Sequence, residues 1–144
     1  MSAADRPTAA PDDTFSLVRH PGAVDLFRFS AVTWNAHRIH YDHGQAAAEG
    51  LPGVVVQSHL HGAYLAQAVL RWGGPRSRIR ALSWRNRLPV TASERVTVRG
   101  VVTAVRTVSG RLLADCALTE LNDRGEPCVT GTATVELAEE RSMP

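Results

Sequence analysis

The side chains best suited to chemistry in this 144-residue chain lie in one short segment, from Asn35 to His43. Three of the six histidines, His37, His40 and His43, fall within seven residues there. Histidine takes up and releases protons near neutral pH, so the segment is a candidate for general acid–base chemistry. A solvated loop with ordinary histidines would have the same composition, and composition alone does not separate these two interpretations.

A metal site is a second interpretation of the histidines. His37, His40 and His43 are spaced three residues apart, and His59 and His61 are two apart. Zinc usually takes three or four His, Cys or carboxylate ligands. The His59 pair lacks the downstream glutamate of a double-stranded β-helix metal site, and a short segment after a strand is poorly suited to two such pairs. We therefore expect no metal ligands.

A second polar group, Gln57, Ser58, His59 and His61, stands at the start of an apolar helix predicted over residues 58–72. The first N–H groups of a helix are unpaired and its dipole adds partial positive charge, so a carbonyl oxygen aimed there would be stabilised as it gains negative charge. Simple capping by Ser58 is the alternative. Ser58 has no nucleophile-elbow sequence around it, which disfavours a serine hydrolase.

All 16 basic residues are arginine, and the absence of lysine excludes Schiff-base chemistry and a Walker-type phosphate loop. Six arginines and no acidic residue fall between positions 51 and 93: Arg71, Arg76, Arg78, Arg80, Arg85 and Arg87. This local charge favours an anionic partner, such as coenzyme A or an acyl carrier protein, although a solvated surface would also explain it. No nucleic-acid motif accompanies the arginines, so we expect no nucleic-acid partner.

The bulk composition is typical of a globular protein, with 44% hydrophobic and 21% charged residues. No apolar run approaches the roughly 18 residues of a membrane span, so we expect no membrane partner. Residues 1–14 predict a disordered tail without a secretory signal. Two cysteines, Cys116 and Cys128, are too few for a disulfide framework, lie in strand-like runs, and favour reduced structural thiols in the cytoplasm.

Hydrophobic periodicity predicts one buried helix and several strands. We expect a strand over 26–33, a polar segment over 35–41, a helical turn over 46–49, the helix over 58–72, and strands over 78–90, 95–108, 111–121 and 129–137. The helix is apolar on nearly every face and must therefore be buried. These elements predict one α+β domain over residues 15–144, with an antiparallel sheet wrapped around a central helix. Because such a sheet leaves open edges, we expect a homodimer.

Beyond these patterns, the chain resembles the MaoC-like hotdog hydratases in two stretches that precede the helix: FRFSAVTWNAHRIHYD at 27–42 and EGLPGVVV at 49–56. It is most similar to the branch of mesaconyl-CoA hydratases and mitochondrial-type hydroxyacyl thioester dehydratases, over residues 24–138. The resemblance implies a dimeric hotdog fold. It also implies reversible hydration of a trans-enoyl thioester to an R-configured 3-hydroxyacyl thioester, without a metal or redox cofactor.

By the same resemblance, His40 falls at the family's catalytic histidine. Where the wider family has Asp-x-Asn-Pro-x-His, this chain has Asn35 at the position of the first acid, as is common in this branch. Asn35 cannot act as a base, but its amide can orient water or a β-hydroxyl group. Asp42 is a candidate substitute acid or base. Gln57 stands where the family usually has histidine, at the start of the helix.

The sequence thus favours a lyase in which His40 and Asn35 are catalytic. We expect the substrate to be a CoA- or carrier-bound acyl thioester, contacted by residues from three segments: His37, Arg38, Gln57, Ser58, His59 and Arg85. Two alternatives remain. One is a hotdog enzyme that cyclises, isomerises or cleaves an intermediate of polyketide or other natural-product biosynthesis. The other is a non-catalytic subunit that binds acyl thioesters.

Overall fold

The computed structural model describes residues 9–138. Its helices and strands, in chain order, are β1 (Thr14–Arg19), α1 (Ala23–Thr33), the short 3₁₀ helix η1 (Arg38–His40), α2 (His43–Ala48), α3 (Ser58–Gly73), β2 (Arg78–Asn86), β3 (Val96–Val108), β4 (Arg111–Leu121) and β5 (Pro127–Leu137).

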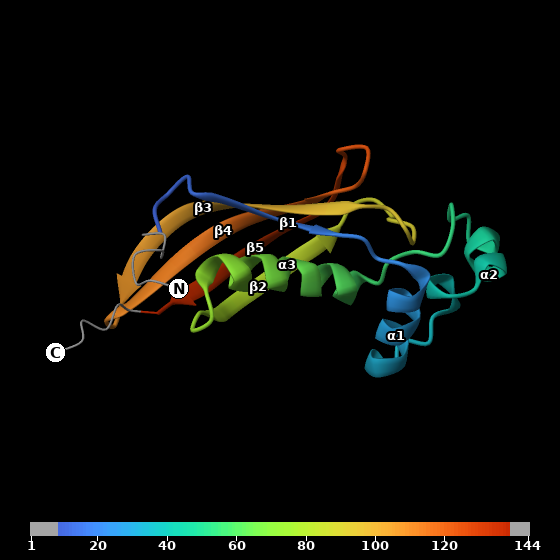
Figure 1. The fold of residues 1–144 in the computed structure, drawn as a ribbon, viewed down its shortest axis with the longest axis horizontal. Helices are drawn as coiled ribbons and strands as arrows, with labels where there is room; N and C mark the ends of the chain where they lie inside the picture. The colour runs from blue at the N-terminus through green and yellow to red at the C-terminus, as the bar shows by residue number, and fades with distance from the viewer. Residues whose placement is uncertain (1–8, 139–144) are drawn as a thin grey trace.

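The strands form one antiparallel sheet in the order β1-β3-β4-β5-β2, and α3 lies along one face of it (Figure 1). Side chains of α3, including Leu65 and Val69, are fully buried against the inward positions of the strands. In β4 these inward positions alternate, with Ala114, Cys116 and Leu118 buried. The predicted α+β architecture, a sheet wrapped around one buried helix, is confirmed.

The helix predicted over residues 58–72 is confirmed, with one residue added at its end. Gln57 is the N-cap, and Gly74, with a positive φ of 87°, ends the helix because most other residues avoid that conformation. The indole ring of Trp84 in β2 packs closely on the first turns. A Cβ added at Gly62 would lie 2.5 Å from that ring, so the absence of a side chain there sets how near β2 and α3 approach.

The meander β3-β4-β5 is also confirmed. The turn at Ser109 and Gly110 joins β3 to β4, and both residues have positive φ, 50° and 75°, as a tight two-residue hairpin requires. In β5, Ala133 and Val135 are buried while Thr132 is exposed, which matches the predicted alternation.

The strand predicted over residues 26–33 is wrong, because this segment belongs to helix α1. Gly22 caps the helix, and its N–H donates to the Asp25 carboxylate at 2.9 Å. Leu26 and Ser30, four residues apart, form the buried face, while Phe27 and Val32 are exposed. The apolar residues therefore follow a helical spacing that partial alternation had obscured.

The sheet contains one strand that the sequence did not predict, β1, and its first residue, Thr14, falls in the expected tail. Residues 1–8 of that predicted tail lie outside the described residues. From Asp12 onward the chain is paired with the sheet: the Asp12 N–H donates to the Val102 carbonyl at 2.8 Å, and the Val102 N–H donates to the Asp13 carbonyl. The ordered domain thus begins before residue 15, and its predicted end at residue 144 also lies outside the described residues.

Among residues 9–138, no helix is long and apolar enough to cross a membrane. Both cysteines are free and buried. Burial raises the pKa of Cys116 to about 11 and that of Cys128 to about 12, so both remain protonated thiols at neutral pH. This agrees with the predicted structural role and disfavours either thiol as a nucleophile.

Candidate active site

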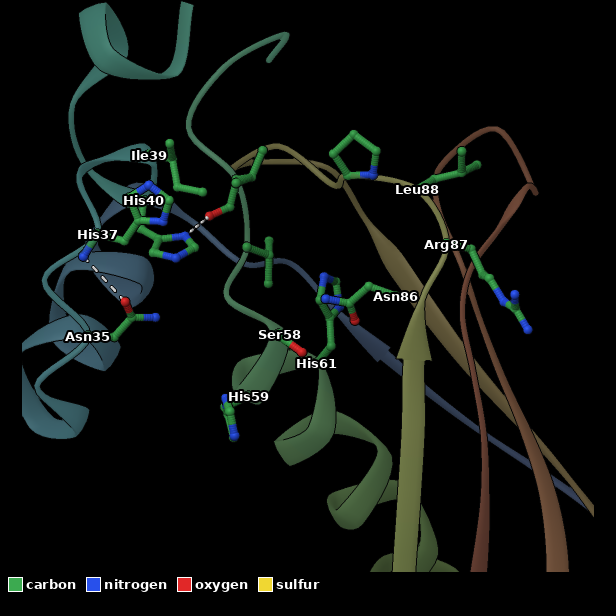
Figure 2. A pocket seen from close by; sticks show the side chains of 13 residues that line it. Asn35, His37, Ile39, His40, Ser58, His59, His61, Asn86, Arg87 and Leu88 are labelled. Carbon is green, nitrogen blue, oxygen red and sulfur yellow. Dashed lines mark hydrogen bonds between the residues drawn. The ribbon is translucent and has the colours of Figure 1, made fainter. Parts of the chain in front are cut away.

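A cavity of about 410 Å³ lies at the amino-terminal end of α3, where the segment after α1 meets the end of β2 (Figure 2). Its wall is formed by three parts of the chain, with these residues: Asn35, His37, Ile39, His40, Val55, Val56, Ser58, His59, His61, Asn86, Arg87, Leu88 and Pro89. The volume is within the range of small-molecule sites. Four of the six histidines of the chain contribute to this wall.

His40 is held rigidly in the wall of this cavity. Only 7% of the residue is exposed, and its Nδ1 lies 2.7 Å from the Val55 carbonyl oxygen (Figure 2). A carbonyl can only accept, so Nδ1 carries the proton and Nε2 of the neutral ring is left with a lone pair. The Val55 N–H in turn donates to the Ile39 carbonyl, which ties the two segments together.

The pKa of His40 is lowered from its ordinary value of 6.5. Burial is the main cause, since it penalises the charged ring, and the charge of His37 adds to it; the hydrogen bond to Val55 opposes both. The ring is therefore neutral at pH 7 and able to accept a proton at Nε2. This is the state that a general base requires.

Asn35 and His37 extend the same wall. The Asn35 side-chain oxygen accepts the His37 N–H at 3.3 Å, which leaves the amide nitrogen of Asn35 free to donate. The His37 and His40 rings meet edge to face with centroids 5.9 Å apart, and His37 Nε2 lies 3.3 Å from Glu49 Oε1 at the surface. The predicted pair Asn35 and His40 is thus brought to one cavity.

The first turn of α3 closes the base of the cavity. Ser58 and His59 both line it, and within residues 9–138 their backbone N–H groups have no hydrogen-bond acceptor. The Trp84 indole N–H contacts the Ser58 carbonyl at 3.1 Å and the Ser58 hydroxyl at 3.2 Å, while His59 packs edge to face on the same ring. This end of the helix offers free donors to an anionic or carbonyl oxygen.

Three residues predicted to bind substrate do not line the cavity. Gln57 is fully buried, and its amide nitrogen donates to the Leu26 carbonyl and to the Ser30 hydroxyl in α1. Arg85 is exposed on β2, next to the residues that do line the cavity. As the N-cap of α3, Gln57 turns its side chain toward α1, a helix that the sequence pattern did not predict.

The third of these residues, Arg38, points to the protein surface, where it pairs with Asp42 at 2.5 Å. Asp42 is the N-cap of α2 and accepts the Gln45 N–H at 3.0 Å. That hydrogen bond and the Arg38 guanidinium lower the pKa of the Asp42 carboxyl, which therefore stays ionised at neutral pH. Asp42 caps and anchors α2, and it does not line the cavity as a substitute acid.

Two further polar groups lie at the site: His61, which the sequence placed at the start of the helix without a predicted role, and Glu120, which it did not indicate. His61 lies one turn into α3 and is 2% exposed, and its Nδ1 is 2.6 Å from Oε1 of the fully buried Glu120 in β4. Glu120 occupies an inward position that follows Ala114, Cys116 and Leu118 in alternation. A carboxylate on the apolar face of a strand was the available signal, but its partner is 59 residues away in the sequence.

Asn86 and Arg87, at the end of β2, form the wall opposite His40 (Figure 2). Both side chains are exposed, and Arg87 Nε donates to the Thr130 hydroxyl at 3.1 Å. Arg87 is thus the member of the arginine-rich segment that reaches the cavity wall. Within the described residues, no group of three or more His, Cys, Asp or Glu side chains is arranged to hold a metal ion.

The chain matches a known protein family. The model of the family described as hydroxyacyl-thioester dehydratase type 2 matches residues 1–92. A mesaconyl-C(4)-CoA hydratase from Chloroflexus aurantiacus is 64% identical over 36 residues, which are 24% of this chain and 13% of that protein. The match therefore covers a small part of a much longer relative.

Solved structures agree on the fold. The (R)-hydratase from A. caviae involved in PHA biosynthesis superposes with a TM-score of 0.83 at 23% identity, over 92% of this chain and 99% of that one. A MaoC-like dehydratase from Rhodospirillum rubrum gives a TM-score of 0.74 at 17% identity, over 92% and 94%. The fold is a hotdog, as predicted from the resemblance.

The sequence motif, the wrapped helix and the family match all lead to the same assignment. The chain belongs to the hydroxyacyl-thioester dehydratase type 2 family, among the MaoC-like hotdog hydratases and dehydratases.

Proposed function

We propose that the protein interconverts an enoyl thioester and a 3-hydroxyacyl thioester, with His40 as a general acid–base residue. The observation that carries this proposal is the state of the His40 ring. It is buried in the cavity wall, donates through Nδ1 to Val55, and presents an unprotonated Nε2. This arrangement suits proton transfer to and from a carbon or oxygen atom of a substrate.

The first turn of α3 supplies the other part of the chemistry. A thioester carbonyl directed at the free N–H groups of Ser58 and His59 would be stabilised as its oxygen becomes negative. Removal of the α-proton by His40 generates that charge, and its return quenches it. The amide nitrogen of Asn35 can donate to water or to the β-hydroxyl group and orient it for the same step.

For the acyl carrier we propose a negatively charged one, coenzyme A or an acyl carrier protein. Arg87 at the cavity wall and the exposed Arg85 beside it support this, whereas Arg71, Arg76 and Arg78 lie at the other end of α3. Arg80 is already paired with Glu136, so its charge is compensated. An anionic carrier that approaches the cavity would meet the positive charges of Arg85 and Arg87.

We also propose a homodimer. Within the described chain, β1 and β2 are the two edges of the sheet and have hydrogen-bond partners on one side alone. Trp34 is 92% exposed next to the site, and Phe27 is 62% exposed on α1. Open edges and exposed aromatic side chains are typical of surfaces that a second copy covers. The free, buried cysteines support a cytoplasmic location.

The proposal is tested by offering the purified chain a panel of enoyl thioesters, crotonyl-CoA, mesaconyl-CoA and a longer trans-2-enoyl-CoA, each also as its carrier-protein conjugate. We expect hydration of at least one, seen as loss of enoyl absorbance and as a 3-hydroxyacyl product. Absence of hydration and of the reverse dehydration across the panel would contradict the proposal. Conversion of a polyketide intermediate without hydration would instead favour the tailoring enzyme.

A further inference from the structure

We infer that His61, positioned by Glu120, is a second proton-transfer residue of the cavity and acts on the β-oxygen of the substrate. This inference rests on the proposed function and extends it. Interconversion of a 3-hydroxyacyl thioester and an enoyl thioester requires two proton transfers, one at the α-carbon and one at the β-oxygen. Asn35 cannot perform either, since an amide neither gains nor loses a proton near neutral pH.

The cost of burying the two groups is the first argument. His61 is 2% exposed and Glu120 is fully buried on the apolar face of the sheet. A buried carboxylate is costly to desolvate, and apolar side chains in place of a buried ion pair usually keep or improve stability. Packing therefore does not explain the pair, whereas perturbed or costly ionisable groups cluster at functional sites.

The orientation of the ring is the second argument. Its Nδ1 faces the Glu120 carboxylate at 2.6 Å, which fixes the tautomer and leaves Nε2 on the other side of the ring. His61 lines the cavity, and Nε2 has no hydrogen-bond partner within residues 9–138. Within residues 9–138, the fully buried side-chain atoms without a partner do not include Nε2 of His61. This nitrogen is therefore accessible from the cavity.

The environments of the two histidines differ in a way that separates their roles. His40 donates to a neutral carbonyl in a buried position, which favours the uncharged ring. His61 has a carboxylate behind it, which compensates the positive charge that the ring gains when Nε2 is protonated. The second carboxylate oxygen, Oε2 of Glu120, is also buried and has no hydrogen-bond partner within residues 9–138. His40 is thus arranged as a base and His61 as an acid.

With these two roles, every proton and electron pair of the dehydration step is accounted for. The Cα–H bond breaks and its proton goes to Nε2 of His40, while the electron pair forms the Cα=Cβ bond. The Cβ–O bond breaks, and the departing oxygen takes the proton from Nε2 of His61 and leaves as water. Hydration is the reverse: His61 takes a proton from water, whose oxygen adds to Cβ, and His40 returns a proton to Cα.

A change of leaving group tests this division of roles. The substrates are the best 3-hydroxyacyl thioester of the panel and its 3-fluoro counterpart, because fluoride departs without needing a proton. In H61Q we expect dehydration to fall about 100-fold or more, the usual contribution of a general acid, while fluoride release stays within a few-fold of wild type. In H40A, which removes the base, both reactions should fall together.

Structural damage would give a different result, since it would slow both reactions of H61Q alike. That outcome, or unchanged dehydration in H61Q, would overturn the inference and leave the proposed function standing. If H61Q does not fold, as judged by thermal melting, E120Q decides by the same ratio of rates. The exposed His43 and Glu126 lie outside the cavity, so H43Q and E126Q serve as controls with wild-type rates. A wild-type protein inactive on both substrates would contradict the proposed function itself.

Discussion

At the scale of single residues, the site depends on how two segments fix one imidazole. His40 follows a polar loop, and its ring would rotate freely without the Val55 carbonyl that holds Nδ1. Val55 itself is held by Ile39, while its neighbours Val54 and Val56 pair with the segment around Val90. This rigidity keeps Nε2 in one position, which a general base needs for efficient proton transfer.

The lowered pKa of His40 gives a prediction for the pH dependence of dehydration, the direction in which His40 accepts the α-proton. Because the neutral ring is the active base, kcat/KM should stay high as pH falls through 6.5 and decline with a midpoint below that value. The measurement is the pH profile of kcat/KM on a 3-hydroxyacyl thioester. A midpoint above 6.5 would contradict the assignment of the acidic limb to His40.

The same shift has a consequence for stability. The unfolded chain binds a proton at His40 more readily than the folded one, so the free energy of unfolding should fall as pH drops below 6.5. Replacement of His40 by glutamine should weaken that decline, and urea unfolding at pH 7.5 and 5.5 measures it.

Asn35 offers a prediction of a different kind. If its amide orients water or the β-hydroxyl, Asn35→Ala should lower kcat about tenfold, the loss expected for one hydrogen bond made in the transition state, with little change in KM. Steady-state kinetics on the same thioester measures both constants. A change in KM alone would mean that Asn35 contributes to binding and not to the chemical step.

At the scale of elements, the sequence predicted what depends on local pattern. The long apolar helix ended by Gly74 and the alternating strands of the meander follow from the periodicity of their own residues. Helix α1 was missed because Phe27, Phe29 and Ala31 imitate a strand, while the cap that starts the helix is a glycine without a side chain. His40 and Asn35 were found because they lie within one short motif.

The parts of the site that could not be predicted join elements far apart in the chain. His61 and Glu120 meet only when α3 packs on β4, and Gln57 reaches α1 across 31 residues. No local pattern encodes such a pair, since each partner satisfies a polar group presented by another element.

The contact between Gln57 and α1 predicts an effect on stability. Gln57→Leu removes both donors to the Leu26 carbonyl and the Ser30 hydroxyl in a buried place, which should cost about 1–3 kcal/mol. Chemical denaturation measures the loss. Gln67→Leu is the matched control, because Gln67 accepts from Arg19 at the exposed surface, where the effect should be within about 1 kcal/mol. Equal losses in the two variants would contradict this account of Gln57.

At the scale of the whole molecule, the sheet is open at β1 and at β2, and α1 carries exposed apolar side chains beside the cavity. A second copy would cover such edges, and closed symmetric pairing is the commonest way for a chain to do so. The prediction is a particle of twice the 15.6 kDa chain mass in light scattering coupled to gel filtration. An active particle of the monomer mass at micromolar concentration would contradict it.

The central claim is that Nε2 of His40 moves the proton at the α-carbon. The most direct measurement is kcat/KM of hydration for His40→Ala, with His43→Gln as the control for loss of an exposed histidine and thermal melting as the check of folding. The account predicts a loss of about 100-fold or more for a folded His40→Ala protein and none for the control. A folded His40→Ala protein that hydrates the thioester at the wild-type rate would contradict it.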